Sequence, residues 1–147
     1  MASAVAFHIR NTKKEDAHAL ALFAIELGYP TTTAEMESRL LRIIPDRHHA
    51  IFIAEDQAPI GWIQVCLVDS LEGGRFAEIL GLVISQNQRR SGAGTQLVGK
   101  AEEWAKENDC CRIRVRTNIV RIEAHSFYTK LGFNLKKTQE VFDKPLQ

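Results

Sequence analysis

The chain has 147 residues, of which 45% are hydrophobic and 25% are charged, and its formal net charge is +1. This length predicts one domain with a single core. The near-neutral charge argues against a dedicated nucleic-acid or membrane-surface binder. No apolar run approaches the ~20 residues that span a bilayer, and the first ten residues lack the basic and apolar regions of a signal peptide.

The three cysteines, Cys66, Cys110 and Cys111, cannot form a closed set of disulfides. Free thiols in a reducing compartment are the simplest interpretation, so we expect a cytoplasmic protein. The chain has no CxxC pair, and His48 and His49 are neighbours rather than spaced ligands. We therefore expect no metal site.

The first half of the chain predicts two helices followed by three strands. Thr12–Glu15 fits a capping box, apolar residues then recur at helical spacing, and Gly28 with Pro30 ends the helix. A second helix is expected from about Thr33 to just before Pro45. The three strands are expected at 51–55, 60–68 and 76–85, with a hairpin between the first two.

The second half of the chain predicts a strand–loop–helix unit and three further elements. The strand that ends at Ser85 is apolar almost throughout, as in a central strand covered on both faces, and Glu78 is the exception. A polar loop follows, and then a helix that ends near Asn108. Alternation predicts a strand over 112–117. The last elements are expected to be a helix at 122–130 and one or two strands at 133–142, which completes a mixed α/β domain.

The loop from Gln86 to Gly94 has the composition of a phosphate cradle. A helix N-terminus presents unpaired N–H groups and about half a positive charge. Gly92 and Gly94 would let the backbone approach an anion, and Arg89 and Arg90 would add charge. The loop is neither a Walker loop nor a dinucleotide fingerprint. A purely structural glycine turn is the alternative.

This loop and its neighbours resemble the motifs of the GNAT superfamily of N-acetyltransferases. Arg89-x-x-Gly92-x-Gly94, preceded by an apolar strand, matches the superfamily's acyl-CoA signature, Gln/Arg-x-x-Gly-x-Gly/Ala. The run 124–133, Ala-His-Ser-Phe-Tyr-Thr-Lys-Leu-Gly-Phe, and Asn118 before it resemble the second motif at its usual spacing. The resemblance covers most of the chain, and its specific motifs lie within 78–133.

The resemblance implies a single GNAT domain over residues 1–147 with acetyl-CoA as cosubstrate and no metal. In that fold a central twisted, mostly antiparallel sheet is flanked by about four helices, and a parallel pair of strands splays apart at the acyl-CoA site. Strand backbone would pair with the pantetheine arm, and the loop would hold the pyrophosphate. The residues implied in CoA binding are Leu82, Val83, Ile84, Arg89, Arg90, Ser91, Gly92, Ala93, Gly94, Thr95, Asn118, Ala124, Phe127, Tyr128 and Lys130.

Two side chains are implied in catalysis, Tyr128 and Glu78. A phenol titrates near ~10 and a thiol near ~8.5, so Tyr128 can donate a proton to the leaving thiolate as general acid. A core aromatic is the alternative. Glu78 would be the base, often through a water, because desolvation raises the pKa of a carboxylate. Binding of the cationic acceptor and a structural salt bridge remain open for it.

The implied reaction is transfer of an acetyl group to a primary amine of a small molecule or a protein, by direct attack of the amine on the thioester. A catalytically silent CoA-sensing or interaction module is the alternative. Arginines at 112, 114 and 116 share a strand face but lack interleaved aromatics, so we expect no nucleic-acid partner. We expect no membrane partner either, and dimers among superfamily members make a homodimer an expectation.

The distribution of charge is consistent with two substrates. Residues 1–85 carry seven basic and eleven acidic side chains, whereas residues 86–130 carry nine basic and five acidic side chains. The basic portion is where the CoA phosphates would bind, and the acidic portion would attract a cationic amine.

Overall fold

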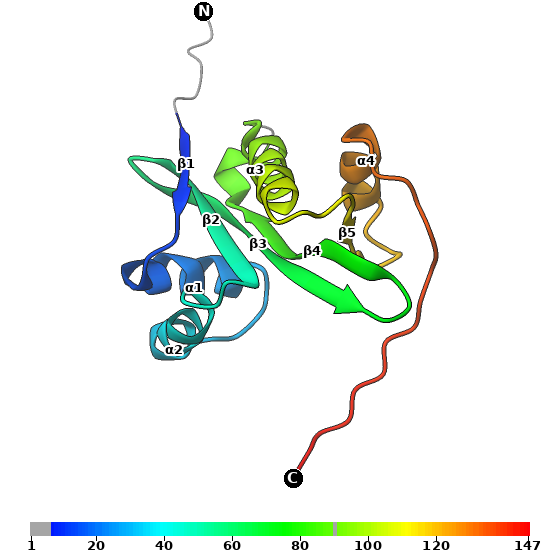
Figure 1. Cartoon of the computed structure of the whole chain (residues 1–147). Coiled ribbons are helices and arrows are strands. Elements are labelled where there is room, and N and C mark those ends of the chain that lie inside the picture. Colours follow the sequence, from blue (N-terminus) through cyan, green and yellow to red (C-terminus); the bar gives the residue numbers. More distant parts are fainter. Residues whose placement is uncertain (1–6, 90) are drawn as a thin grey trace, which may run out of the picture. The chain divides into compact units, whose positions relative to one another are not determined.

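A computed structural model describes residues 7–89 and 91–147. The chain falls into two units, Met1–Val115 and Arg116–Gln147. In its described part the first unit holds a five-stranded sheet with three α-helices, and the second unit holds one α-helix (Figure 1). Among the described residues, no helix has the length and apolar character needed to cross a membrane.

The strands of the first unit lie in sequence order across the sheet. They are β1 (His8–Asn11), β2 (His49–Asp56), β3 (Ala58–Ser70), β4 (Gly74–Ile84) and β5 (Ile113–Val115). Neighbours from β1 to β4 pair antiparallel. Only β4 and β5 are parallel, from Ala77↔Ile113 to Ile79↔Val115. This confirms the predicted mixed fold, with its mostly antiparallel sheet and one parallel pair.

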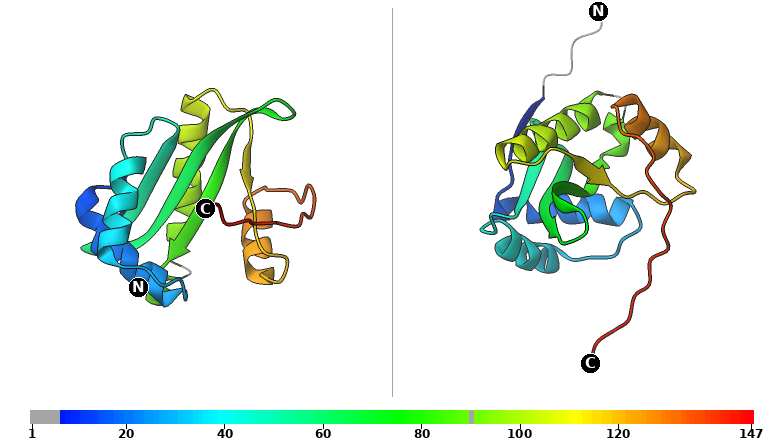
Figure 2. Two further views of the ribbon diagram at one scale, coloured as in Figure 1. Left: turned by 90° about the horizontal axis from the view of Figure 1, so that it is seen from below. Right: turned by 45° about the vertical axis from the view of Figure 1, so that its right-hand side comes forward.

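Helices cover both faces of this sheet (Figure 2). On one face, α1 (Ala17–Glu26) and α2 (Thr33–Ile43) bury a shared cluster with the sheet, and on the other face α3 (Ala93–Glu107) contacts β2, β3 and β4. Burial of these apolar side chains is the main favourable contribution to packing. The cluster beneath α1 and α2 consists of Ala17, Leu20, Phe23, Leu40, Ile53 and Val83, with Met36, Ile51 and Trp62 packed against it.

The second unit contains α4 (Ile122–Lys130), and its C-terminal part forms no helix or strand. The prediction of a strand or strands at 133–142 is therefore wrong. The apolar residues there find no strand partner within the described chain, and Leu135, Val141 and Phe142 are more than four-fifths exposed. Pattern alone does not make a strand, because strand pairing is a long-range interaction.

The start of the chain also differs from the prediction. The sequence did not indicate β1, whose four residues are too few to show a clear alternation. The Thr12–Glu15 capping box is wrong: the carboxylate of Asp16 instead accepts a hydrogen bond from the backbone N–H of Lys13 at 2.8 Å. This bond holds the 3₁₀ turn Lys14–Asp16 that leads into α1. The hydroxyl of Thr12 is buried and has no hydrogen-bond partner among the described residues.

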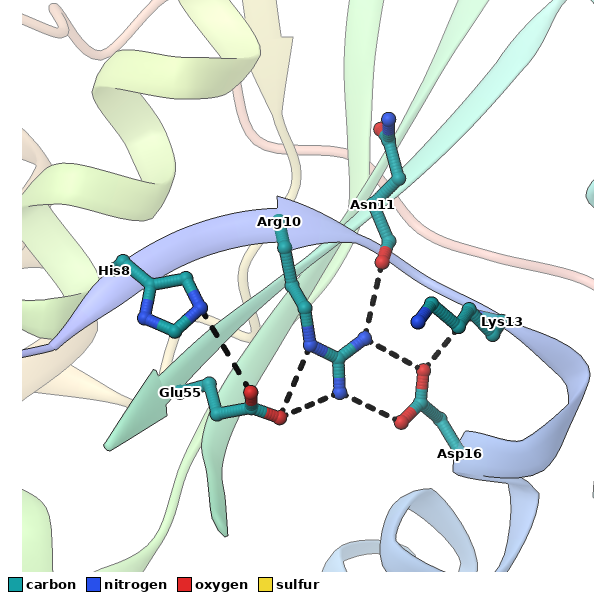
Figure 3. A network of polar contacts seen from close by, with 6 residues as sticks. All are labelled: His8, Arg10, Asn11, Lys13, Asp16 and Glu55. Carbon is teal, nitrogen blue, oxygen red and sulfur yellow. Dashed lines mark hydrogen bonds and ion pairs between the residues drawn. The ribbon is translucent and has the colours of Figure 1, made fainter. Parts of the chain in front are cut away.

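A charge network ties β1, β2 and this turn together (Figure 3). The Arg10 guanidinium donates to both carboxylate oxygens of Asp16 at 2.8 and 2.9 Å, and to Glu55 at 2.7 and 3.0 Å. These charge-assisted bonds lower the pKa of both carboxyl groups and raise the pKa of Arg10. The network therefore stabilises the fold at neutral pH and weakens as the carboxylates become protonated.

Replacing Asp16 with Asn removes the charge and keeps the shape of the side chain. We expect Tm at pH 7 to fall by about 5 °C. Because the Asp16 pKa is lowered in the folded state, its stabilisation is present above the ordinary carboxyl pKa of about 4 and is lost as pH falls through the lowered value. The difference in Tm from wild type should therefore shrink progressively as pH falls below the ordinary carboxyl range. Glu15→Gln, in the same turn but exposed, is the control. An equal difference at pH 3 and pH 7 would contradict the role of the charge.

Candidate functional site

A break in strand pairing marks the centre of the candidate site. Gln64 pairs with Gly81 and Val65 pairs with Ile79, which leaves Leu80 as an extra residue on β4. Such a bulge twists a strand and re-aims its backbone. Pairing with β5 ends at Ile79 as well. The backbone of residues 80–84 is thus paired only to β3 within the described sheet, and its outer edge can accept an extended ligand as an added strand.

The sheet register places Glu78 on the face that α1 and α2 cover. Residues paired across neighbouring strands share a face, and on β3 the side chains of Trp62, Gln64 and Cys66 alternate onto one face. Trp62 packs against the cluster beneath α1 and α2, and Cys66 pairs with Glu78. Glu78 therefore lies on the same face as Trp62, opposite the face of α3.

Glu78 is half-buried and lies beside a buried thiol. The backbone N–H of Glu78 donates to the thiol of Cys66, which is 7% exposed. Burial raises the pKa of this thiol, and the charge of Glu78 adds to the effect. Cys66 is therefore protonated at neutral pH and is not a thiolate nucleophile. Glu78 places a carboxylate on this face.

Two arginines stack on one aromatic ring: Arg112, which directly precedes β5, and Arg114, which lies within it. The guanidinium carbons of Arg112 and Arg114 lie 4.2 and 4.5 Å from the centre of the Phe76 ring. Nη2 of Arg112 also donates to the carbonyl of Gly73 at 2.8 Å. Cation–π stacking of this kind favours fixed positions for both charges. Arg114 pairs in register with Glu78, so one fixed cation neighbours the candidate carboxylate.

The loop after β4 ends in a helix N-terminus with a left-handed residue. Gly92 is the N-cap of α3 and has φ +90°, a conformation that favours glycine. The Ser91 hydroxyl accepts a hydrogen bond from the N–H of Ala93 at 3.3 Å. The N–H groups of Gly94 and Thr95 belong to the first helical turn, in which the helix itself supplies no acceptor. This geometry fits an anion such as a pyrophosphate.

The remaining residues of the first unit that were predicted to bind CoA lie in the same loop and on β4. Arg89 is exposed in the loop before this helix, and the predicted CoA-binding residue Arg90 lies outside the described residues. On β4, Leu82, Val83 and Ile84 lie in the stretch that has left β5. The first unit thus brings together the unpaired strand edge, the glycine-containing loop and Glu78 along one continuous segment. No three His, Cys, Asp or Glu side chains group as a metal site requires in the ranges that the structure describes.

In the second unit, Tyr128 is buried among aromatic rings. It is 9% exposed, and its ring makes edge contacts with Phe127 at 5.0 Å and Phe133 at 5.3 Å between ring centres. Burial raises the pKa of the Tyr128 phenol, and Arg121 opposes this in part. The phenol is consequently protonated at neutral pH, as a proton donor must be. Both the acid role and the core role remain compatible with this environment.

The remaining residues of the second motif lie on or just before α4. The side-chain oxygen of Asn118 accepts from the N–H of Val120 at 3.1 Å and shapes the turn that leads into the helix. Ala124 and Phe127 are half-buried, and Lys130 is exposed. Their grouping on one short helix follows the predicted element at 122–130.

Sequence reasoning missed Trp62 and Cys66 as site residues. Both were hidden in an apolar strand, where they look like packing residues. The signal that could have found them is their spacing with Gln64: three side chains two residues apart must share one strand face. The spacing alone does not show that Glu78 lies on this face as well. That follows only from the register between β3 and β4.

Comparisons with known proteins agree with this architecture. The model of the acetyltransferase (GNAT) family matches residues 13–133. Aminoglycoside N(6')-acetyltransferase type 1 of Serratia marcescens is 26% identical over 102 residues, which are 65% of this chain and 70% of that protein. Streptothricin acetyltransferase A of Bacillus subtilis (strain 168) is 40% identical over 58 residues, which are 40% of this chain and 34% of that protein.

A solved structure shows the same fold. The aminoglycoside antibiotic 6'-N-acetyltransferase AAC(6')-Ih from Acinetobacter baumannii superposes with a TM-score of 0.83 at 19% sequence identity. The match covers 97% of this chain and 100% of that chain. At this identity the comparison supports the arrangement of strands and helices.

Gly92 and Gly99 distinguish the effect of backbone strain on stability from the effect of the space available to a side chain. An added Cβ would meet no atom within 4 Å at Gly92 or at Gly99, yet only Gly92 has a positive φ. We expect Gly92→Ala to lower the free energy of unfolding by about 1–2 kcal/mol. Gly99→Ala, within α3, should raise it by about 0.5–1 kcal/mol. Urea unfolding measures both values. Changes of the same sign would show that the left-handed backbone does not govern position 92.

Proposed function

Because the chain belongs to the acetyltransferase (GNAT) family, we propose that it transfers an acetyl group from acetyl-CoA to a primary amine of a small molecule. The chain is an acyltransferase of that family. The observation that carries the proposal is the continuous segment of the first unit in which β4 leaves β5, passes its bulge and leads into the glycine-capped start of α3. In this proposal residues 1–147 act as one acetyltransferase domain.

The residues of β4 and of the following loop would hold the cosubstrate. The outer backbone edge of Leu82, Val83 and Ile84 supports pairing with the amides of the pantetheine arm. The residues from Arg89 to Thr95 would bind the pyrophosphate, with Gly94 and Thr95 donating their N–H groups. From the second unit, Asn118, Ala124, Phe127, Tyr128 and Lys130 are proposed to complete CoA binding. Acetyl-CoA supplies the activated thioester.

Three groups of the chain would assist the direct attack of the amine. A backbone N–H near the bulge would stabilise the oxygen that becomes negative as the amine attacks. Glu78 would take up the proton of the attacking amine or bind its cationic form. The phenol of Tyr128, protonated because burial raises its pKa, would donate the proton to the leaving thiolate.

The acceptor is proposed from the relatives and from charge. Two curated relatives are named for aminoglycoside and streptothricin acetylation, which supports a small-molecule amine rather than a protein. The acidic excess in residues 1–85 supports attraction of a cationic acceptor.

Assembly and location are part of the same proposal. We propose a homodimer, supported by the exposed apolar side chains of Leu135, Val141 and Phe142 and by β5, which is an edge strand of the described sheet. We propose a cytoplasmic location, supported by the free thiols of Cys66, Cys110 and Cys111.

Release of the CoA thiol tests the activity across a panel of amines that contains aminoglycosides, streptothricin, polyamines and lysine peptides. We expect release with at least one small-molecule amine. Tyr128→Phe should lower its rate by about 10²-fold and should weaken acetyl-CoA binding much less, because the ring that contacts the cosubstrate is kept. Tyr29→Phe, at the exposed second tyrosine, is the control. Acetyl-CoA binding without release for any amine would favour the CoA-sensing module, and unchanged turnover in Tyr128→Phe would refute the acid role.

The pH dependence of Glu78→Gln separates the two roles of this carboxylate. As a base, Glu78 matters most at lower pH, where more of the amine is protonated, so the loss of kcat/KM should be concentrated there. Glu72→Gln, in the exposed turn before β4, is the control. A loss that is equal at every pH, with a raised KM for the acceptor, would assign Glu78 to acceptor binding instead.

A further inference from the structure

We infer that Trp62 limits the length of the acyl group that this site accepts. The indole covers Gly81, directly beside the bulge of β4, and so closes the space into which a longer acyl chain would extend. The inference rests on the proposed function and specifies which acyl-CoA thioesters that site takes.

The contact between Trp62 and Gly81 is close. A Cβ built on Gly81 would lie 2.8 Å from Cη2 and 3.0 Å from Cζ3 of the indole, which is closer than atoms can approach without displacement. Trp62 itself pairs with Val83, so its ring reaches diagonally along β4 to Gly81. The far edge of the six-membered ring therefore fills the space that a side chain at position 81 would occupy.

The position of the acyl group follows from the direction of β4. The proposed pyrophosphate site at 89–95 follows the C-terminal end of the strand, at Ile84. A pantetheine arm that pairs with residues 84 to 82 therefore runs back toward the bulge, and its thioester end comes to Leu80 and Gly81. Atoms beyond an acetyl methyl would need the space that the indole takes.

The indole is fixed by packing on its other side. Trp62 packs against the cluster that contains Leu20, Leu40 and Val83. Its Nε1–H is buried and has no hydrogen-bond partner among the described residues. An unpaired buried donor costs free energy, so apolar packing rather than a polar bond holds the ring in place.

A cavity lies beside the indole on the side of α1 and α2. It has a volume of about 150 Å³, and mainly apolar side chains line it together with Trp62, including Leu20, Met36, Leu40 and Ile51. Removing the distal ring of Trp62 would join this apolar space to the region over Gly81. A longer acyl chain would then find both room and apolar surroundings.

The test compares the affinities of CoA, acetyl-CoA, propionyl-CoA and butyryl-CoA by isothermal titration calorimetry, without any acceptor. Wild type should bind butyryl-CoA at least about tenfold more weakly than acetyl-CoA. Trp62→Leu should reduce this difference to within about threefold and leave the Kd for CoA itself unchanged. Thiol release with the same thioesters should shift in the same direction.

Two further variants make the result specific. Trp104→Leu makes the same substitution on α3, on the opposite face of the sheet, and should keep the wild-type preference. Trp62→Phe keeps an aromatic ring of shorter reach, so it should relax the preference for acetyl-CoA in part. This variant tests the inference if Trp62→Leu fails to fold.

The outcomes distinguish the inference from the proposed function. Wild-type discrimination that persists in folded Trp62 variants would overturn the inference, as would a wild type that binds all three thioesters equally. If wild type bound no CoA at all, the proposed function would fail, and the inference with it.

Discussion

The pairing of β4 is the constraint on which the candidate site depends. This strand is antiparallel to β3 along nearly its whole length but stays with β5 only as far as Ile79. The extra residue at Leu80 allows β4 to keep its bonds to β3 while its outer edge is released. An edge of this kind is normally a liability, because it invites pairing with another chain. Here it adjoins the start of α3, and in the proposed function the same feature serves as the binding surface for the cosubstrate.

The helices on the two faces of the sheet support different parts of the candidate site. On one face α3 anchors the segment that leads from the strand edge to the helix N-terminus. On the other face α1 and α2 hold Trp62 beside the bulge, on the face that also carries Glu78. The Arg10 network connects β1, β2 and the turn before α1, and so fixes the start of that second layer. Stability of the network and geometry of the site are in this way linked through α1.

Much of the fold could be predicted from the sequence because its signals are local. The helical periodicity of α3 and the need for glycine at Gly92 are properties of short segments, and the structure agrees with both. The motif around Tyr128 predicted α4 at the correct residues. The bulge at Leu80 and the contact of Trp62 with Gly81 could not be predicted, since both depend on the register between strands. The strands expected at 133–142 are absent for the same reason: a few local apolar residues do not specify a strand partner.

The close approach of Trp62 to Gly81 has a consequence for the history of the family. The two positions are not free to change independently, because any side chain at 81 requires the ring at 62 to move or to shrink. Homologues with a smaller residue at position 62 have room for a side chain at position 81, whereas those that keep tryptophan have room for one only where the ring is displaced. Substitutions at positions 62 and 81 should therefore occur together, and such a pair of substitutions indicates a changed shape of the space beside the bulge.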